Sequence, residues 1–440
     1  MKRKGFLLKT LSLVFSLSLL SPFAGNTIKA FAEPAQQTAA AVAQTEPNIT
    51  AKSAITMDLK TGEVIYSKNA SAKAYPASTT KLMTALLFAE KAQKGDQIPF
   101  TKTAKEQPPY SLHSNWPGVT LKVGDTMTAD DVMKGLLIFS GNDAAYMIAD
   151  YVAGSKEAFS DLMNKKAKEL GMNNTHFITP NGLHDDNHYT TAYDLALLTK
   201  AALSNPWIRE IVGLKETTIT IGNKPVKLEN RNTGLGENGN LGGKTGTTTP
   251  AGDCLAALYE RDGRQVIGVV LHSENKGNTD HSFRQKEMNA IMDYSYAQNP
   301  TAFKTNGTKL EDVTLKYKLF RFFGPEKSIT VPVTLSEDAM LYKNTFNDTH
   351  AKLQYVPGDQ TAWQVASNND VNVKLTSGIY SKDLKGNVDI STMQILKANA
   401  LAYLGILVAV VVILVLIIFI IRFINMRRRR RRRYSSYRRY

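Results

Sequence analysis

The chain has a single cysteine, Cys254, among its 440 residues, so an intramolecular disulfide is impossible. This excludes the disulfide-stapled type of extracellular domain. Histidine is also scarce, because seven histidines are scattered along the chain and no H-E-x-x-H motif occurs. The sequence therefore predicts no metal site, and we expect no cofactor. Cys254 lies in the apolar stretch 253–259, where we expect a small core residue rather than a nucleophile.

Acidic residues are absent from both ends of the chain. Residues 1–32 hold five basic residues and no acid, and residues 401–440 hold ten basic residues and no acid. The whole chain has 54 Lys and Arg against 39 Asp and Glu, so the part between the ends carries 39 residues of each sign. The basic character therefore belongs to the end segments and does not indicate a polyanionic substrate. We expect no nucleic-acid partner.

The N-terminus has the pattern of a secretory signal peptide. Basic residues within 2–9 precede an apolar run from Leu11 to Phe23, and small residues follow at Ala30 and Ala32. We predict a signal peptide over residues 1–32, cleaved after Ala32, and a flexible leader over 33–48. A retained membrane anchor is the alternative, which the shortness of the apolar run disfavours.

The C-terminus has the pattern of a membrane span. Residues 401–421 are uncharged and almost wholly apolar, and at about 1.5 Å per residue their helix is long enough to cross a bilayer. An Arg-rich segment, 422–440, follows. Because basic residues favour the cytoplasmic side, we predict one transmembrane helix with the preceding chain outside and a cytoplasmic, lipid-contacting tail. A buried core helix and a nucleic-acid-binding tail are the disfavoured alternatives.

The order of predicted elements indicates an α+β fold. Strand patterns at 54–59 and 63–67 come first, helical patterns fill the middle, and strands at 253–260 and 265–272 precede a helix over 280–298. This order predicts a mainly antiparallel sheet with helices on its faces and a helical insert.

We place this first domain at residues 49–300. Residues 310–392 show short Val, Thr and Leu alternations without a good helical pattern, which predicts a small, separate, all-β domain. The transmembrane helix follows at 401–421.

Ser78 and Lys81 form an S-x-x-K motif at the start of a predicted helix that runs to about Ala92. Residues three apart share a helix face, and a hydroxyl beside an amine is an activated nucleophile in many enzymes. S-x-x-K is the serine motif of β-lactamases and penicillin-binding proteins. The motif alone is weak, because it recurs from Ser273 to Lys276 at a predicted strand end, and because Ser78 could simply cap its helix.

Two further motifs accompany Ser78. Ser140-Gly141-Asn142 interrupts two helical patterns, and Lys244-Thr245-Gly246 leads into the apolar strand at Leu255. K-T-G also occurs at 60–62, but there it lies in a predicted hairpin turn before the serine. Only the set of Ser78, Ser140 and Lys244 follows the order of a helix start, a loop and a strand.

With these motifs the chain resembles the low-molecular-weight penicillin-binding proteins of the D-alanyl-D-alanine carboxypeptidase family, which are S11-type serine peptidases. The stretches 138–144, 179–183, 189–195 and 244–252 support the resemblance. It implies a three-layer αβα fold of the β-lactamase/transpeptidase type. It also implies release of the terminal D-Ala from peptidoglycan pentapeptide stems, with β-lactam antibiotics as covalent inhibitors, at the outer face of a bacterial cell membrane.

The resemblance implies three catalytic residues. Ser78 attacks the carbonyl between the two D-alanines, Lys81 is the base, and Ser140 relays a proton to the leaving amine. The implied substrate-binding residues are Asn142, Lys244, Thr245, Gly246 and Thr247.

Their implied roles differ. Asn142 holds the peptide amide, Lys244 and Thr245 take the terminal carboxylate, and the N–H groups of Ser78 and Thr247 form the oxyanion hole.

A lysine base needs its pKa lowered from about 10.4 to about 7–8, and we expect the charge of Lys244 to contribute to this. Whether Lys81 alone, or Ser140 with Lys244, carries the proton stays open. Arg231 is a further candidate for facing the site, with a surface-loop arginine as the alternative.

Two other functions compete with this reading. A β-lactamase needs a carboxylate and a water for fast deacylation, but no convincing E-x-x-L-N loop lies between Ser140 and Lys244, and the second motif reads S-G-N rather than S-D-N. An inactive wall-binding scaffold is disfavoured by the presence of all three motifs. The family commonly ends in an amphipathic surface anchor, whereas this chain has a hydrophobic span and an Arg-rich tail.

Overall fold

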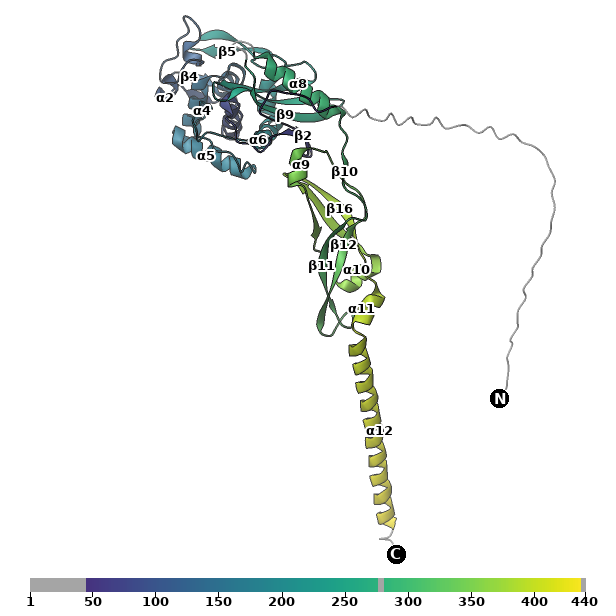
Figure 1. Cartoon of the computed structure of the whole chain (residues 1–440). Coiled ribbons are helices and arrows are strands. Elements are labelled where there is room, and N and C mark those ends of the chain that lie inside the picture. Colours follow the sequence, from purple (N-terminus) through teal and green to yellow (C-terminus); the bar gives the residue numbers. More distant parts are fainter. Residues whose placement is uncertain (1–44, 276–280, 437–440) are drawn as a thin grey trace, which may run out of the picture. The chain divides into compact units, whose positions relative to one another are not determined.

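The computed structural model describes residues 45–275 and 281–436 (Figure 1). The predicted signal peptide and all but the last four residues of the predicted leader lie outside this part of the chain. This part of the chain contains two five-stranded sheets, each with its own hydrophobic core.

The first sheet has five antiparallel strands in the order β2-β1-β9-β8-β7. Its strands are β1 (Ser53–Asp58), β2 (Val64–Lys68), β7 (Asn240–Thr248), β8 (Gly252–Arg261) and β9 (Arg264–Ser273). The four predicted strands are confirmed, and they pair as the hairpins β1–β2 and β8–β9. The β1–β2 turn contains the K-T-G sequence at residues 60–62. Its Gly62 adopts the left-handed conformation that glycine tolerates (φ +77°).

Helices cover both faces of this sheet. Helix α8 (Ser282–Ala297) and helix α6 (Ala192–Ser204) lie on opposite sides of β9 (Figure 1). Along β1, Ala54 faces the core on the α8 side, whereas Ile55 and Met57 face the larger core. A Cβ at Gly268 of β9 would lie only 2.3 Å from the Met288 sulfur, so α8 approaches the strand where a side chain is missing. Both faces are therefore buried.

The middle of the chain is helical, as predicted. The elements are η1 (Ala77–Thr80), α1 (Lys81–Ala89), α3 (Ala129–Lys134), η3 (Gly135–Phe139), α4 (Asn142–Ala153), α5 (Lys156–Glu169) and α7 (Pro206–Val212). The hydroxyls of Thr128, Ser155 and Thr191 cap α3, α5 and α6. Helix α7 was not predicted; Asn205 caps it, and Pro206 occupies its first position.

The second sheet has the order β11-β12-β16-β15-β14. Its strands are β11 (Lys309–Lys318), β12 (Glu326–Leu335), β14 (Lys352–Val356), β15 (Asp370–Ser377) and β16 (Tyr380–Val388). The prediction that this region contains no helix is wrong, because α9 (Thr345–His350) and α10 (Ala362–Asn368) lie within it. At six and seven residues these helices are too short to produce a helical period in the sequence.

Helix α9 packs against the edge of the first sheet. The side-chain amides of Asn344 and Asn347 donate to the carbonyl of Val64 in β2 at 3.0 and 2.9 Å. The Ser67 hydroxyl, also in β2, lies 2.9 Å from that of Thr345. Polar side chains of α9 and its cap thus satisfy backbone groups of β2, which is an outer strand of its sheet.

The C-terminal segment is helical. Helix α11 (Thr392–Ala398) was not predicted and begins with a capping box of Ser391 and Gln394. Helix α12 (Ala400–Ser436) contains the predicted span and continues through the arginine block. Within the described residues, it is the one helix long and apolar enough to cross a membrane.

Candidate active site

The S-x-x-K serine lies at the junction of two helical segments. Ser78 is in the short 3-10 helix η1, and Lys81 is the first residue of α1. The Lys81 Nζ atom is 2.9 Å from the Ser78 Oγ atom. Ala77, directly before the serine, has a φ of +46°, a strained conformation for a residue with a Cβ. Ser78 is partly exposed and Lys81 is fully buried, so the hydroxyl is the accessible member of the pair.

Three oxygen atoms surround the Lys81 amine. Besides Ser78 Oγ, Nζ contacts Asn142 Oδ1 at 3.1 Å and the Asn181 carbonyl at 2.8 Å. A neutral amine has two N–H donors and one lone pair, and the two amide oxygens can only accept. In the neutral state the lone pair therefore faces the Ser78 hydroxyl, which donates its hydrogen bond to Lys81. This is the arrangement that a general base requires.

The pKa of Lys81 is suited to that role. The pKa of Lys81 is lowered to about 7, mainly by burial; the positive charge of Arg231 contributes to the shift, and Asp143 opposes it. Burial also lowers the pKa of Lys244, and the charge of Lys81 adds to that effect. The direction matches the sequence-based expectation. Burial is the main cause, Arg231 adds a like charge that the sequence did not predict, and the mutual repulsion of Lys81 and Lys244 acts in the expected direction.

Ser140 and Lys244 form a second hydroxyl–amine pair. Ser140 adopts a left-handed conformation between η3 and α4 (φ +75°), and Lys244 Nζ lies 3.0 Å from its Oγ atom. Because Asn142 begins α4 and contacts Lys81, the S-G-N turn joins the two pairs. The expectation that Lys244-Thr245-Gly246 leads into the strand of Leu255 is wrong. These residues lie inside a separate strand, β7, which pairs with that strand across the turn at 249–251.

Gly246 brings strand β7 against the nucleophile. A Cβ at this position would lie 2.9 Å from the Ser78 nitrogen and 3.0 Å from the Thr79 nitrogen and the Pro76 carbonyl. Only glycine permits this approach without a shift of the backbone. Thr247, the next residue, is exposed, so β7 presents its end beside the partly exposed Ser78.

We expect Gly246→Ala to lower the rate of Ser78 acylation by about 10²-fold or more, because the added methyl group displaces β7 from η1 and a small misplacement is costly at a reacting centre. Stopped-flow acylation by a fluorescent penicillin measures this. Gly95→Ala is the matched control, since nothing lies within 4 Å of a Cβ there. Equal rates for the two variants would contradict the close approach.

Thr247 is held by a buried charged network that the sequence analysis missed. Its hydroxyl donates to Asp253 at 2.7 Å and accepts from Arg284 at 3.1 Å. Asp253 is fully buried and also contacts the His281 ring at 2.9 Å. These partners lie on β8, at the start of α8 and just before it, and no motif in the sequence links them to β7.

Arg231 lies close to the site, as one of the two expectations for it had proposed. Its guanidinium stacks on the rings of Tyr110 and Phe139 at 4.7 and 5.3 Å from their centres. It is half-buried, and it lowers the pKa values of Lys81 and Lys244 through its charge. Arg231 therefore supplies positive charge beside both amines.

Asp143 was also missed. Its carboxylate accepts from the backbone N–H groups of Leu112 and His113 at 2.8 and 2.9 Å, which fixes the short 3-10 helix η2 (Leu112–Ser114) to the start of α4. Asn142, the preceding residue, donates its side-chain amide to the Pro109 carbonyl at 3.0 Å. The side chains of Asn142 and Asp143 thus hold the S-G-N turn against the segment that contains Pro109, Leu112 and His113.

His188 connects the loop of Asn181 to the helix of Ser78. Its Nδ1 atom accepts from the N–H groups of Ile178 and Thr179 at 3.1 and 3.3 Å, so Nε2 carries the proton and donates to the Thr80 hydroxyl at 2.9 Å. The stretch 179–183, noted in the sequence, therefore contributes a backbone carbonyl to the lysine.

We expect this imidazole to make stability depend on pH. Burial lowers the pKa of His188 to about 4, against about 6.5 in the unfolded chain. Its contribution is present above pH 6.5 and is lost as the pH falls through 4, a change of about 3 kcal/mol. Urea unfolding of the wild type and of His188→Gln should show a stability difference that shrinks from pH 7 to pH 4. A constant difference would refute the assignment.

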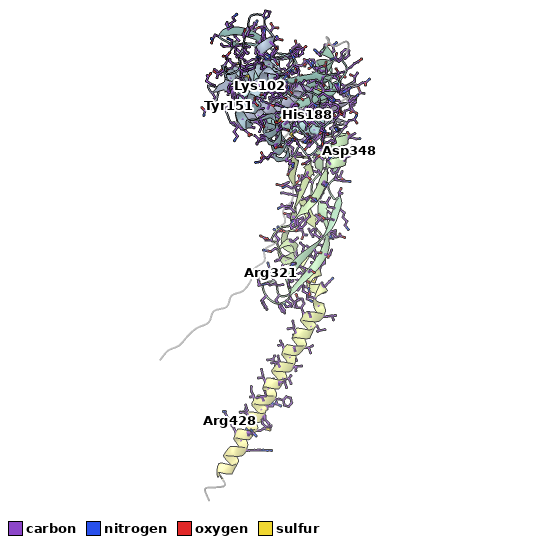
Figure 2. All side chains as sticks on the ribbon, turned by 90° about the vertical axis from the view of Figure 1, so that its left-hand side faces the viewer. Lys102, Tyr151, His188, Arg321, Asp348 and Arg428 are labelled. Atoms are coloured by element: carbon purple, nitrogen blue, oxygen red, sulfur yellow. The ribbon has the colours of Figure 1, made fainter. Side chains whose placement is uncertain are left out.

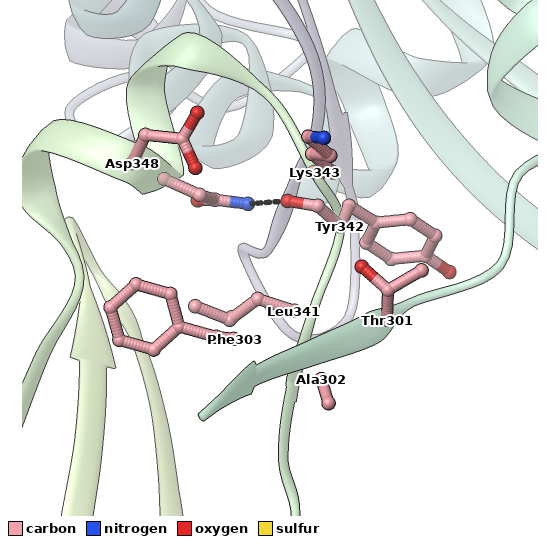
Figure 3. A pocket seen from close by; sticks show the side chains of 8 residues that line it. Thr301, Ala302, Phe303, Leu341, Tyr342, Lys343 and Asp348 are labelled. Atoms are coloured by element: carbon pink, nitrogen blue, oxygen red, sulfur yellow. Dashed lines mark hydrogen bonds between the residues drawn. The ribbon is translucent and has the colours of Figure 1, made fainter. Parts of the chain in front are cut away.

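A pocket of about 280 Å³ lies elsewhere, beside β10 (Thr301–Lys304), β13 (Ala339–Leu341) and α9 (Figure 3). Among its lining residues, the Asn347 side-chain amide donates to the Tyr342 carbonyl at 2.8 Å. Its lining residues are Thr301, Ala302, Phe303, Leu341, Tyr342, Lys343, Asn347 and Asp348. Among residues 45–275 and 281–436, no group of three His, Cys, Asp or Glu is placed to hold a metal.

Comparison with known proteins gives consistent results. A family model described as D-alanyl-D-alanine carboxypeptidase matches residues 40–275. The chain is 35% identical over 266 residues to the D-alanyl-D-alanine carboxypeptidase DacF of Bacillus subtilis, covering 59% of this chain and 66% of that protein. It is 33% identical over 271 residues to a D-alanyl-D-alanine carboxypeptidase of Streptomyces sp. K15, covering 58% of this chain and 91% of that protein.

Solved structures agree. The Streptomyces K15 DD-transpeptidase aligns with a TM-score of 0.52 at 30% identity, covering 58% of this chain and all of that one. A D-alanyl-D-alanine carboxypeptidase of Mycobacterium tuberculosis aligns with a TM-score of 0.54 at 26% identity, covering 59% of this chain and 96% of that one. The family match over residues 40–275 thus includes all five strands of the first sheet and the helices of the middle of the chain.

Proposed function

Since the chain belongs to the peptidase S11 family of D-alanyl-D-alanine carboxypeptidases, we propose that it releases the terminal D-Ala from peptidoglycan pentapeptide stems through an acyl-enzyme on Ser78. One observation carries this proposal. The Ser78 hydroxyl is partly exposed and lies 2.9 Å from a buried lysine whose remaining contacts are two amide oxygens.

Acylation begins with the neutral Lys81 amine, which takes the proton of Ser78. The Ser78 Oγ atom then bonds to the carbonyl carbon of the penultimate D-Ala, and the N–H groups of Ser78 and Thr247 stabilise the oxyanion. Collapse of this intermediate breaks the C–N bond, and the leaving amine takes a proton through Ser140. Water then hydrolyses the ester and regenerates Ser78.

The amines of Lys81 and Lys244 have different roles in the proposed reaction. Lys81 contacts Ser78 and therefore serves the attacking oxygen, whereas Lys244 contacts Ser140 at 3.0 Å and serves the leaving group. Lys244 and Thr245 on β7 bind the terminal carboxylate of the substrate. Asn142 orients Lys81 through Oδ1 and keeps one amide hydrogen for the peptide.

Beyond the catalytic residues, we assign the chain three-layer αβα architecture over residues 49–300 and a separate β-rich domain over 310–392. Helix α12 anchors the protein in a bacterial cell membrane as a single-pass span over 401–421. The catalytic domain lies on the cell-wall side, and the Arg-rich segment 422–440 contacts lipid on the cytoplasmic side. Signal-peptide cleavage after Ala32 precedes this arrangement.

The activity is tested by measuring D-Ala release from diacetyl-Lys-D-Ala-D-Ala by the purified chain, with penicillin adducts followed by mass. Steady release, together with a Ser78 adduct that lasts many minutes, supports the carboxypeptidase. Adduct turnover within seconds indicates a β-lactamase instead. An absence of release, with equal peptide binding by the wild type and Ser78→Ala, indicates a wall-binding scaffold.

A further inference from the structure

The turn between β11 and β12 exposes two neighbouring aromatic rings. This segment, residues 319–325, is called the aromatic turn below. Phe322 and Phe323 are 78% and 65% exposed, whereas the apolar side chains of the strands that lead into it are mostly buried. Figure 2 labels Arg321 at this turn. Exposing two adjacent phenylalanine side chains to water is unfavourable in free energy. Exposed apolar patches of this kind mark sites that contact another protein or a membrane.

The aromatic turn is held in a defined shape. The Phe320 ring stacks on Phe323 with 5.1 Å between ring centres, and the Phe320 N–H donates to the Phe323 carbonyl at 3.1 Å. The Leu319 N–H donates to the Pro325 carbonyl at 3.1 Å, and Arg321 has a φ of +67°. The rings are therefore presented by an ordered turn.

The same turn contacts the start of the apolar helix. The Tyr403 hydroxyl donates to the Leu319 carbonyl at 2.7 Å, and its ring lies 5.9 Å from that of Phe320. Asn399, directly before α12, donates to the Tyr317 hydroxyl at 2.6 Å. Tyr403 is the fourth residue of α12, so the turn lies beside the first turn of the helix proposed to cross the membrane.

We propose that the aromatic turn is a lipid-contact site, which inserts Phe322 and Phe323 into the interfacial layer of the leaflet that α12 enters. This rests on the proposed membrane anchor. Phenylalanine side chains of segments that lie on a membrane are buried at the boundary between headgroups and acyl chains. The exposed basic residues Lys318, Arg321 and Lys327 flank the rings and suit anionic headgroups.

Depth-dependent quenching tests the proposal on the full chain in vesicles of phosphatidylethanolamine and phosphatidylglycerol. An environment-sensitive fluorophore is attached to Phe322→Cys, Thr314→Cys or Val411→Cys, and nitroxide lipids act as quenchers. Thr314 is exposed on the same hairpin about 13 Å from the end of its strand, so it is the matched control. Val411 lies within α12 and reports the anchor. Cys254 is buried, and the labelled wild type gives its background.

We expect a shallow nitroxide to quench the label at 322 at least twofold more than the label at 314, and a deep nitroxide to quench the label at 411. Equal, weak quenching at 322 and 314 with strong quenching at 411 would overturn the lipid contact and leave the anchor intact. Weak quenching at all three positions would overturn both. Quenching at 322 without quenching at 411 would overturn the span and, with it, the insertion of the rings beside α12.

Discussion

Replacing Ser78 by alanine should abolish both D-Ala release and covalent capture of penicillin, with a rate loss on the order of 10⁴-fold or more. The reason is chemical, since no acyl-enzyme forms without the Oγ atom. The fold should be unaffected because Ser78 is partly exposed and its side chain contacts Lys81, which keeps its other two acceptors. The measurements are peptide hydrolysis and the mass of the penicillin-treated protein.

Ser71→Ala is the matched control for this variant. Ser71 is exposed in the turn that precedes η1, so its loss should leave both readouts unchanged. An adduct on the Ser78→Ala protein, or hydrolysis within tenfold of the wild-type rate, would show that another residue is the nucleophile.

The second large effect concerns the protonation of Lys81. The base works only as the neutral amine, so acylation should rise with pH through the pKa of about 7 and level off above it. At pH 5, two units below that value, the rate should be about 100-fold lower than at its plateau. Stopped-flow acylation from pH 5 to pH 9 gives the profile.

Two substitutions test the identity of the base. Lys81→Ala removes it and should lower acylation on the order of 10⁴-fold, as for other nucleophile–base units. Lys81→Arg keeps a positive charge that does not titrate in this range, so it should be equally inactive at every pH. Lys91→Ala, at an exposed position in the same region, should retain the wild-type profile. A wild-type midpoint near pH 10 would contradict the buried, neutral lysine.

Much of the catalytic arrangement follows from short motifs that specify local structure. The S-x-x-K spacing places Ser78 and Lys81 together because both lie on one turn, and the S-G-N sequence ends one helix and starts another. Contacts made by backbone atoms do not depend on the residue type and therefore produce no sequence motif. The Asn181 carbonyl at Lys81 depends on a loop held by His188, about 100 residues further along the chain.

Other differences have similar physical causes. Strand β7 carries three glycines and three threonines besides its lysine and therefore lacks an apolar alternation, so the sequence did not show it as a strand. The Asp253–Arg284 pair that holds Thr247 is a tertiary contact between elements 31 residues apart. Helices α9 and α10 are brief enough that their caps, rather than a period, define them.

The hydrogen bonds from Asn344 and Asn347 to strand β2 affect the behaviour expected of a truncated chain. Cutting after α8 would retain every proposed catalytic residue but remove Asn344 and Asn347, leaving the Val64 carbonyl and its neighbours unpaired on an outer strand. Such an edge is a template for pairing with another molecule. We therefore expect a fragment ending near residue 300 to retain D-Ala release yet to aggregate, which would give the C-terminal region a solubilising role independent of any membrane.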